Sequence, residues 1–282
     1  MFTLAQLVCC LLVPGCLALA LGAFRQYSER GPAIGLGGGI LVFSALVGHL
    51  TAALTAGDAL WPPRDGWHWA IFACFALTLL ILVRPLGPVR GWTPSFLSVV
   101  LHGLLAGLGA WLLLRPLANL SRGEITAWAM GFAVITGVTA ALTEVGLNGT
   151  RRMGWLALAG AAAGTAAGVV AGGSKDLGLL AGTLAAAASA LAIAGTPTTG
   201  AGAGVIPMGW FALVGVHYAS LHPASAGFLL AAPSTIALAQ IPAIARHPRL
   251  ADALRQFAPL AVSGLGIALG IALTPKDNGP TY

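Results

Sequence analysis

Runs of about twenty apolar residues, separated only by short polar connections, recur from one end of this chain to the other. The hydrocarbon core of a bilayer is about 30 Å thick, and a helix needs roughly 20 apolar residues to cross it. Only 8% of the 282 residues are charged, where a soluble domain carries about 25%. The sequence therefore predicts an all-α, polytopic transmembrane helix bundle. Its spans, about ten, are expected at residues 3–23, 34–56, 68–86, 95–114, 125–146, 153–172, 177–196, 204–221, 225–244 and 256–273.

The polar stretches are too short to form a soluble domain. None is longer than about 12 residues, whereas a separate domain needs ~50 residues or more. We therefore expect residues 1–282 to form a single transmembrane domain. The short connections also favour consecutive helices that pack as antiparallel neighbours.

The basic residues indicate an orientation, because Lys and Arg accumulate in short cytoplasmic loops. Alternate connections on one side hold nine: Arg25, Arg30, Arg84, Arg90, Arg151, Arg152, Arg246, Arg249 and Arg255. The other side holds five: Arg64, Arg115, Arg122, Lys175 and Lys276. This predicts a multi-pass protein of the cell (inner) membrane with both termini on the outer side. The net charge of +6 is spread over many loops, which favours attraction to lipid head groups over nucleic acid binding. All eight Trp lie near the ends of the runs, as in an aromatic belt.

Two local features modify the simple picture of straight spans. The stretch 246–257 places Leu250, Leu254 and Phe257 on one helical face, which is typical of a helix lying flat at the membrane interface. Pro14 and Pro233 fall inside predicted spans. Proline removes an intrahelical hydrogen bond, so both are expected to be flexible points.

Small residues predict how the helices pack. In lipid, association depends on close approach of helix backbones, which glycine permits. Four glycines recur at every fourth position of one run, Gly160, Gly164, Gly168 and Gly172, and two more follow at the same spacing, Gly178 and Gly182. We expect a partner backbone against the first stripe and expect the two runs to be neighbours, with Ser174 as an N-cap. A homo-oligomer formed through the stripe is the alternative.

Titratable groups inside a span are energetically costly and are candidates for function. Glu144 and His102 are two such groups, and Thr139 and Thr143 share a helical face beside Glu144. These four residues form the candidate proton or cation site. The alternatives are that Glu144 pairs with Arg151 or Arg152 and that His102 is a hydrogen-bonded core residue.

A second candidate site lies toward the outer side. His49 and His217 would make a metal or haem pair if their helices brought them together, since neutral imidazole is a common metal ligand. The connection that holds Asp58, Asp65 and His68 is rich in Trp and Pro. It is expected to be a gate or docking surface, or else an interfacial cap.

Catalytic motifs are missing from the sequence. There is no Cys-x-x-Cys, Gly-x-Ser-x-Gly or His-Glu-x-x-His, and Gly200–Gly204 lacks the Lys-Ser/Thr ending of a phosphate loop. An enzyme is therefore not favoured, and no cofactor is assigned. We expect a small secondary transporter or permease; its length and helix count are similar to those of small ten-helix drug and metabolite exporters, without their motifs. A non-catalytic membrane subunit or scaffold is the alternative, and a haem- or metal-handling protein is the second alternative.

Overall fold

A computed structural model describes residues 5, 8–27, 36–56, 96–117, 119–148, 150–198 and 200–273 of the chain. Every regular element in these ranges is a helix. In chain order they are η1 (Val8–Leu12), α2 (Val13–Tyr27), α3 (Leu36–Ala56), α5 (Phe96–Leu114), α6 (Arg122–Leu147), α7 (Arg152–Ala171), α8 (Lys175–Ala194), η2 (Ala201–Gly204), α9 (Val205–Tyr218), α10 (Pro223–Ala231), η3 (Ala232–Gln240), α11 (Pro242–Ala245) and α12 (Pro248–Leu273). The all-helical fold class is as predicted.

Six helical segments in the described residues are long and apolar enough to cross a membrane. They are Phe96–Leu114, Arg122–Leu147, Arg152–Ala171, Lys175–Ala194, Ala201–Tyr218 and Pro248–Leu273. Val8–Phe24 and Ile40–Thr51 are shorter apolar helices. These helices make the chain a candidate multi-pass membrane protein. They do not confirm ten spans, and the predicted span 68–86 lies outside the described residues.

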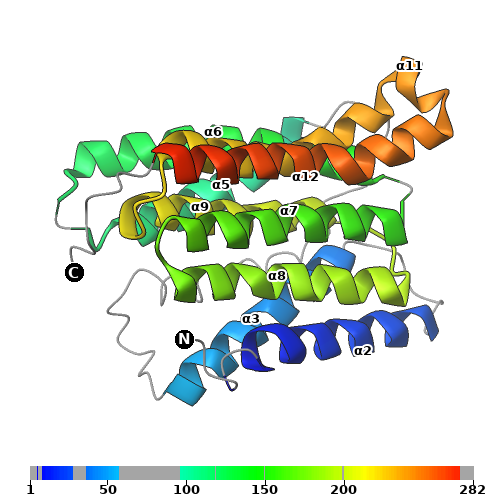
Figure 1. The fold of residues 1–282 in the computed structure, drawn as a ribbon, viewed down its shortest axis with the longest axis horizontal. Coiled ribbons are helices and arrows are strands. Elements are labelled where there is room, and N and C mark those ends of the chain that lie inside the picture. The colour runs from blue at the N-terminus through cyan, green and yellow to red at the C-terminus, as the bar shows by residue number, and fades with distance from the viewer. Residues whose placement is uncertain are drawn as a thin grey trace.

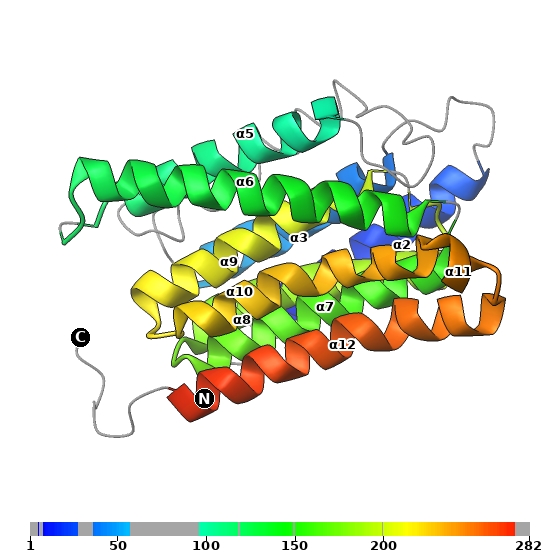
Figure 2. The same cartoon turned by 90° about the horizontal axis from the view of Figure 1, so that it is seen from above.

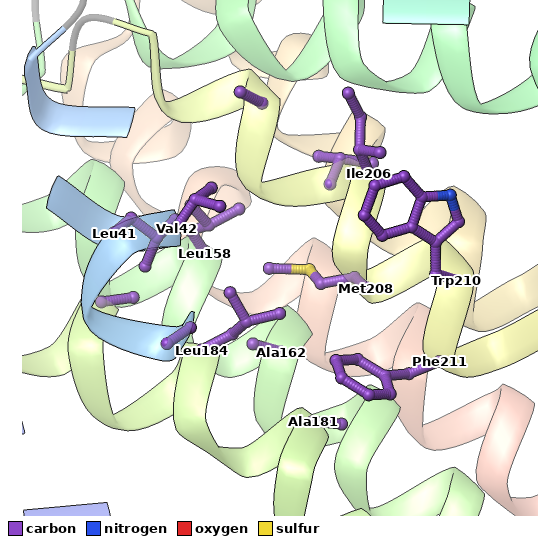
Figure 3. Packing of buried hydrophobic residues seen from close by; sticks show 14 of the residues in the cluster. Leu41, Val42, Leu158, Ala162, Ala181, Leu184, Ile206, Met208, Trp210 and Phe211 are labelled. Carbon is purple, nitrogen blue, oxygen red and sulfur yellow. The ribbon is translucent and has the colours of Figure 1, made fainter. Parts of the chain in front are cut away.

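The helices form a bundle with α9 in its interior. Figure 1 shows α12, α7, α8 and α2 side by side in one row, and the bundle also includes α3, α5, α6, α9 and α10 (Figure 2). Side chains from α3, α7 and α8 converge on Met208 and Phe211 of α9 (Figure 3), both about 1% exposed. A helix that is apolar all round has to be buried in this way or face lipid.

Local capping signals position the helix ends. Ser121 begins α6 in a capping box, because its hydroxyl accepts the Glu124 amide and the Glu124 carboxylate accepts the Ser121 amide. Ser174 begins α8 and accepts the Leu177 amide at 3.4 Å, which confirms the predicted N-cap. The α7 and α8 helices are joined by a short turn and pack together, as predicted.

The predicted ninth span is not a uniform helix. It begins as α10 and continues from Ala232 as the nine-residue 3-10 helix η3. The change of helix type falls at Pro233, which cannot supply the amide hydrogen that an α-helix needs there. Runs of 3-10 helix longer than three or four residues are uncommon and often mark hinges.

The prediction of a separate interfacial helix at residues 246–257 was wrong. The chain makes only one helical turn at α11, and α12 then runs without interruption from Pro248 to Leu273. Pro259 lies inside α12, yet the helix continues through it. The amphipathic stretch is therefore the first part of a long helix, because no turn follows Phe257 to separate the two.

The glycine stripe of α7 is covered by this chain itself. A Cβ at Gly160 or Gly164 would meet Leu260 or Ser263 of α12, and a Cβ at Gly168 would meet Leu229 of α10. A close backbone contact occurs at Gly172, where the added Cβ would lie 2.9 Å from the Ala219 carbonyl oxygen. Side chains, rather than the expected partner backbone, therefore fill most of the stripe.

The two glycines of α8 have different neighbours. An added Cβ at Gly178 would lie 2.9 Å from the Ala166 carbonyl oxygen of α7, whereas at Gly182 it would lie at an ordinary 3.6 Å from Leu11. Gly178 therefore permits the close approach of α7 and α8.

Candidate functional site

The connection between α8 and α9, of which the structure describes residues 195–198 and 200–204, is mostly buried chain that is not α-helical. We call it the α8–α9 linker. Gly195 and Gly200 adopt positive φ values of 66° and 74°, which side chains disfavour. Thr196 is fully buried, and so are the residues of η2. Backbone amides and carbonyls at such a place need partners, because hydrocarbon and protein core offer no water.

Glu144 supplies two of these partners from the last turn of α6. The Gly200 amide donates to Oε1 at 2.7 Å, and the Gly202 amide donates to Oε2 at 2.7 Å. Each carboxylate oxygen therefore binds one linker amide. Gly202 also packs closely on α6, since a Cβ there would lie 2.5 Å from the Ala140 carbonyl oxygen.

The alternative prediction, that Glu144 pairs with Arg151 or Arg152, was wrong. Arg152 instead donates from Nε to the Ala192 carbonyl oxygen at 3.3 Å. Within the described part of the chain the one salt bridge joins Arg255 and Asp252. Glu144 therefore binds backbone amides of the linker and not the arginine side chains that are near it in sequence.

A main-chain carbonyl of α6 and a side chain of α7 also hold the N-terminal half of the linker. The Thr198 hydroxyl lies 2.7 Å from the Leu147 carbonyl oxygen, at the end of α6. The indole N–H of Trp155 donates to the Thr196 carbonyl oxygen at 2.8 Å. Donors and acceptors from two helices thus fix the path of the linker.

Two tryptophans contradict the expected aromatic belt. Trp155 and Trp210 are 0% and 2% exposed. Trp210 donates its indole N–H to the Ala106 carbonyl oxygen at 3.0 Å. Both rings are therefore core residues whose N–H groups bind main-chain carbonyls, rather than residues at the head-group level.

The same turn of α6 also contacts the second irregular segment, η3. A Cβ at Gly146 would lie 2.6 Å from the Ala237 nitrogen, so the two backbones touch. Gln240 donates from Nε2 to the Gly146 carbonyl oxygen at 3.4 Å. The last turn of α6 therefore holds two 3-10 segments, η2 through Glu144 and η3 through Gly146.

Thr139 and Thr143 lie on α6 as predicted but do not bind Glu144. The Thr143 hydroxyl donates to the Thr139 carbonyl oxygen at 2.7 Å, within the helix. Both side chains are buried. The partners of the Glu144 carboxylate are instead the Gly200 and Gly202 amides.

His102 is buried on α5, away from Glu144. Its Nδ1 lies 2.7 Å from the Ser98 carbonyl oxygen. The α5 backbone near His102 touches α6 at Gly137. Glu144 is seven residues further along α6, about 10 Å at a rise of ~1.5 Å per residue. The structure does not bring the two predicted transport residues together.

His49 and His217 also lie apart. His49 Nε2 is 2.9 Å from the Leu180 carbonyl oxygen, and its ring meets Phe211 edge-on at 5.5 Å between centroids. His217 is six residues beyond Phe211 on α9 and packs edge-on against Trp128 at 4.9 Å. Six residues of helix span about 9 Å, so the rings do not form a ligand pair.

Metal binding finds no further support in the described ranges, where no group of three or more His, Cys, Asp or Glu could hold an ion. The predicted outer-site residues Asp58, Asp65 and His68 lie outside the described residues.

Comparisons with protein-family models, with curated proteins and with solved structures find no match to this chain. Sequence reasoning singled out Glu144 but missed its partners. The glycine-rich segment Gly200–Gly204 was tested only as a phosphate loop, although closely spaced glycines also expose amides to a carboxylate from the same chain.

Proposed function

We propose that this chain is a small secondary transporter of the cell membrane and that Glu144 couples solute movement to protons. The supporting observation is the Glu144 carboxylate, which binds the Gly200 and Gly202 amides at the start of the innermost helix, α9. Glu144 is half-buried in a predicted span, where a carboxylate is costly to keep and is by default a functional group.

The chemistry of the carboxyl group makes this contact sensitive to protonation. An ionised carboxylate only accepts hydrogen bonds, so both oxygens suit the two amide donors. A protonated carboxyl group carries a hydrogen on one oxygen. That hydrogen repels the hydrogen of the amide that donates to the same oxygen. Protonation therefore weakens one of the two contacts and loosens the linker from α6.

The irregular segments give this change a mechanical consequence. Many transporters form their binding sites from broken helices. Parts of the helix bundle then move around the site between inward- and outward-facing states. Here η2 and η3 both contact the last turn of α6. A proton arriving at Glu144 would release η2 while η3 remains held through Gly146.

A vesicle assay with a panel of solutes tests the proposal. Inside-out and right-side-out vesicles containing the full chain are given a pH gradient that a fluorescent dye reports. Organic cations, amino acids, sugars and carboxylates are then added one at a time. We expect at least one solute to dissipate the gradient only in vesicles that contain the protein.

Glu144→Gln is the decisive variant, and Glu124→Gln is its matched control. Both residues lie on α6 and both accept backbone amides, but Glu124 is exposed at the opposite end. We expect Glu144→Gln to slow coupled transport by ~100-fold or more, as when a proton-transfer group is removed. Glu124→Gln should behave as wild type. Equal activity of the two variants would exclude Glu144 as the coupling group, and a silent panel in both vesicle orientations would contradict transport.

The orientation is part of the proposal. Arg151, Arg246 and Arg249 lie at the connections of one end of the bundle, and Arg122 and Lys175 begin helices at the other. We place the first end in the cytoplasm. In a background without native cysteines, Lys175→Cys should react with an impermeant maleimide in whole cells, whereas Arg246→Cys should react only after permeabilisation. The reverse pattern would invert the orientation.

A non-catalytic membrane subunit is the second candidate. The observation in its favour is a core whose buried polar side chains, in the described ranges, are only Ser, Thr and His. A solute path is usually more polar. Mild purification followed by mass spectrometry distinguishes the two, because a subunit would retain partner chains in a fixed ratio. The haem- or metal-handling alternative needed His49 and His217 to converge, and we do not propose it.

A further inference from the structure

Two buried polar atoms of neighbouring helices have no hydrogen-bond partner in the part of the chain that the structure describes. They are Nε2 of His102 on α5 and Oγ1 of Thr136 on α6. The two residues are 1% and 0% exposed. Protein interiors pair almost all such groups with protein atoms or ordered water, so an unpaired one requires an explanation.

The hydrogen bond at Nδ1 determines what His102 Nε2 needs. Nδ1 lies 2.7 Å from the Ser98 carbonyl oxygen and 3.2 Å from the Ser98 hydroxyl oxygen. A carbonyl oxygen only accepts, so the shorter contact assigns the hydrogen to Nδ1. In a neutral imidazole the other nitrogen is then a bare acceptor. His102 Nε2 therefore calls for a partner that donates.

Thr136 differs from Thr143 and Thr165, two other buried threonines of the long helices. Thr143 and Thr165 return their hydroxyl hydrogens to carbonyl oxygens four residues earlier, at 2.7 and 3.1 Å. Thr136 makes no such bond. Its hydroxyl is available both to donate to a guest and to accept from one.

Packing places the two groups at one level of the bundle. A Cβ at Gly137 would lie 3.0 Å from the Gly103 Cα, so α5 and α6 touch there. His102 and Thr136 are the residues immediately before these two glycines.

The two groups also face the same helix, α9. Gly109 lies two turns after His102 on the same face of α5, and a Cβ there would collide with the Trp210 ring. Phe132, one turn before Thr136 and on the same face, would contact a Cβ at Gly209. Both Trp210 and Gly209 belong to α9, so the two side chains lie on the same side of the α5–α6 pair.

We propose that His102 and Thr136 bind one small guest at the junction of α5, α6 and α9. The guest donates an O–H or N–H hydrogen to His102 Nε2 and exchanges a second hydrogen bond with the Thr136 hydroxyl. Water is the smallest molecule with this chemistry, and the hydroxyl or amine of a solute is the other source. The site does not depend on transport, so it stands or falls separately from the role of Glu144.

Nitrogen-15 NMR of the histidine rings tests the site in the full chain reconstituted in lipid bilayers. His102→Gln identifies the His102 signals by their loss. We expect Nδ1 to be protonated and Nε2 to be unprotonated but hydrogen-bonded, with a cross-peak to water protons. Thr136→Val removes the hydroxyl at nearly constant volume and should abolish that cross-peak. Thr165→Val is the matched control, because its hydroxyl binds its own helix, and it should leave the spectrum unchanged.

Addition of ethanolamine separates the two sources of the guest. A water cross-peak that ethanolamine leaves unchanged identifies water. A Nε2 signal that shifts with ethanolamine in wild type but not in Thr136→Val identifies a site for hydroxyl- or amine-bearing solutes. The proposal is overturned if wild-type Nε2 shows no hydrogen bond under either condition, or if Thr136→Val reproduces the wild-type spectrum.

Discussion

Gly202→Ala tests the contact between the linker and Glu144 on which the proposed coupling depends. The added Cβ would lie 2.5 Å from the Ala140 carbonyl oxygen and 3.0 Å from Glu144 Oε2, where ordinary contacts begin at 3.4 Å. The linker would have to move away from α6 by roughly an ångström, which is enough to break a hydrogen bond of 2.7 Å. Overpacking costs ~1–3 kcal/mol. Losing a hydrogen bond to a charged group costs ~1.5–3 kcal/mol. We therefore expect a loss of about 2.5–6 kcal/mol of unfolding free energy.

Gly131→Ala is the control for this experiment. Gly131 is also on α6, but a Cβ there would meet nothing within 4 Å, and alanine has the higher helix propensity, by up to ~1 kcal/mol. Tryptophan fluorescence during SDS titration in mixed micelles gives the unfolding free energies. Gly202→Ala should unfold at much lower SDS than wild type, and Gly131→Ala should not. If the two variants unfold alike, the linker does not pack against α6 as described and coupling through this contact is refuted.

Two further substitutions, one in the linker and one in the glycine stripe of α7, are tested by the same titration. Thr198→Val removes the hydroxyl that approaches the Leu147 carbonyl oxygen and should cost about 1 kcal/mol; no loss would mean that the linker is not held there. Gly164→Leu should prevent folding of the monomer, because a Cβ at Gly164 already collides with Ser263, whereas Gly264→Leu on α12, with nothing within 4 Å, should be tolerated. A folded Gly164→Leu monomer that has lost only a dimer would instead assign the stripe to self-association.

The presence of helices was predictable from composition. A chain that crosses hydrocarbon has few other structures in which its backbone hydrogen-bonding groups are all satisfied. The run predicted at 95–114 is the helix Phe96–Leu114, and those at 153–172 and 177–196 lie within two residues of α7 and α8. The structure differs from the predicted helices in two places. Pro233 changed a helix to the 3-10 form, and the amphipathic start of α12 resembled a separate surface helix.

Candidate side chains were harder to interpret than helices. The rarity of charge in apolar runs identified Glu144, and the same rule identified His49 and His102. Their partners did not follow from it. Glu144 has Arg151 seven residues away along the chain, but it binds amides 56 and 58 residues away. Trp155 and Trp210 lie near helix ends in sequence, yet neighbouring helices cover them completely.

The sequence by itself determined that this chain is built from apolar helices, because long uncharged runs are stable only as helices that satisfy their own backbone groups. Tertiary structure decided what the few polar groups do. The linker amides, the Glu144 carboxylate and the last turn of α6 meet only after helices distant in sequence have packed. Hydrogen-bond partners of a buried group are set by which backbone lies within about 3 Å of it, and spacing along one helix does not contain that information.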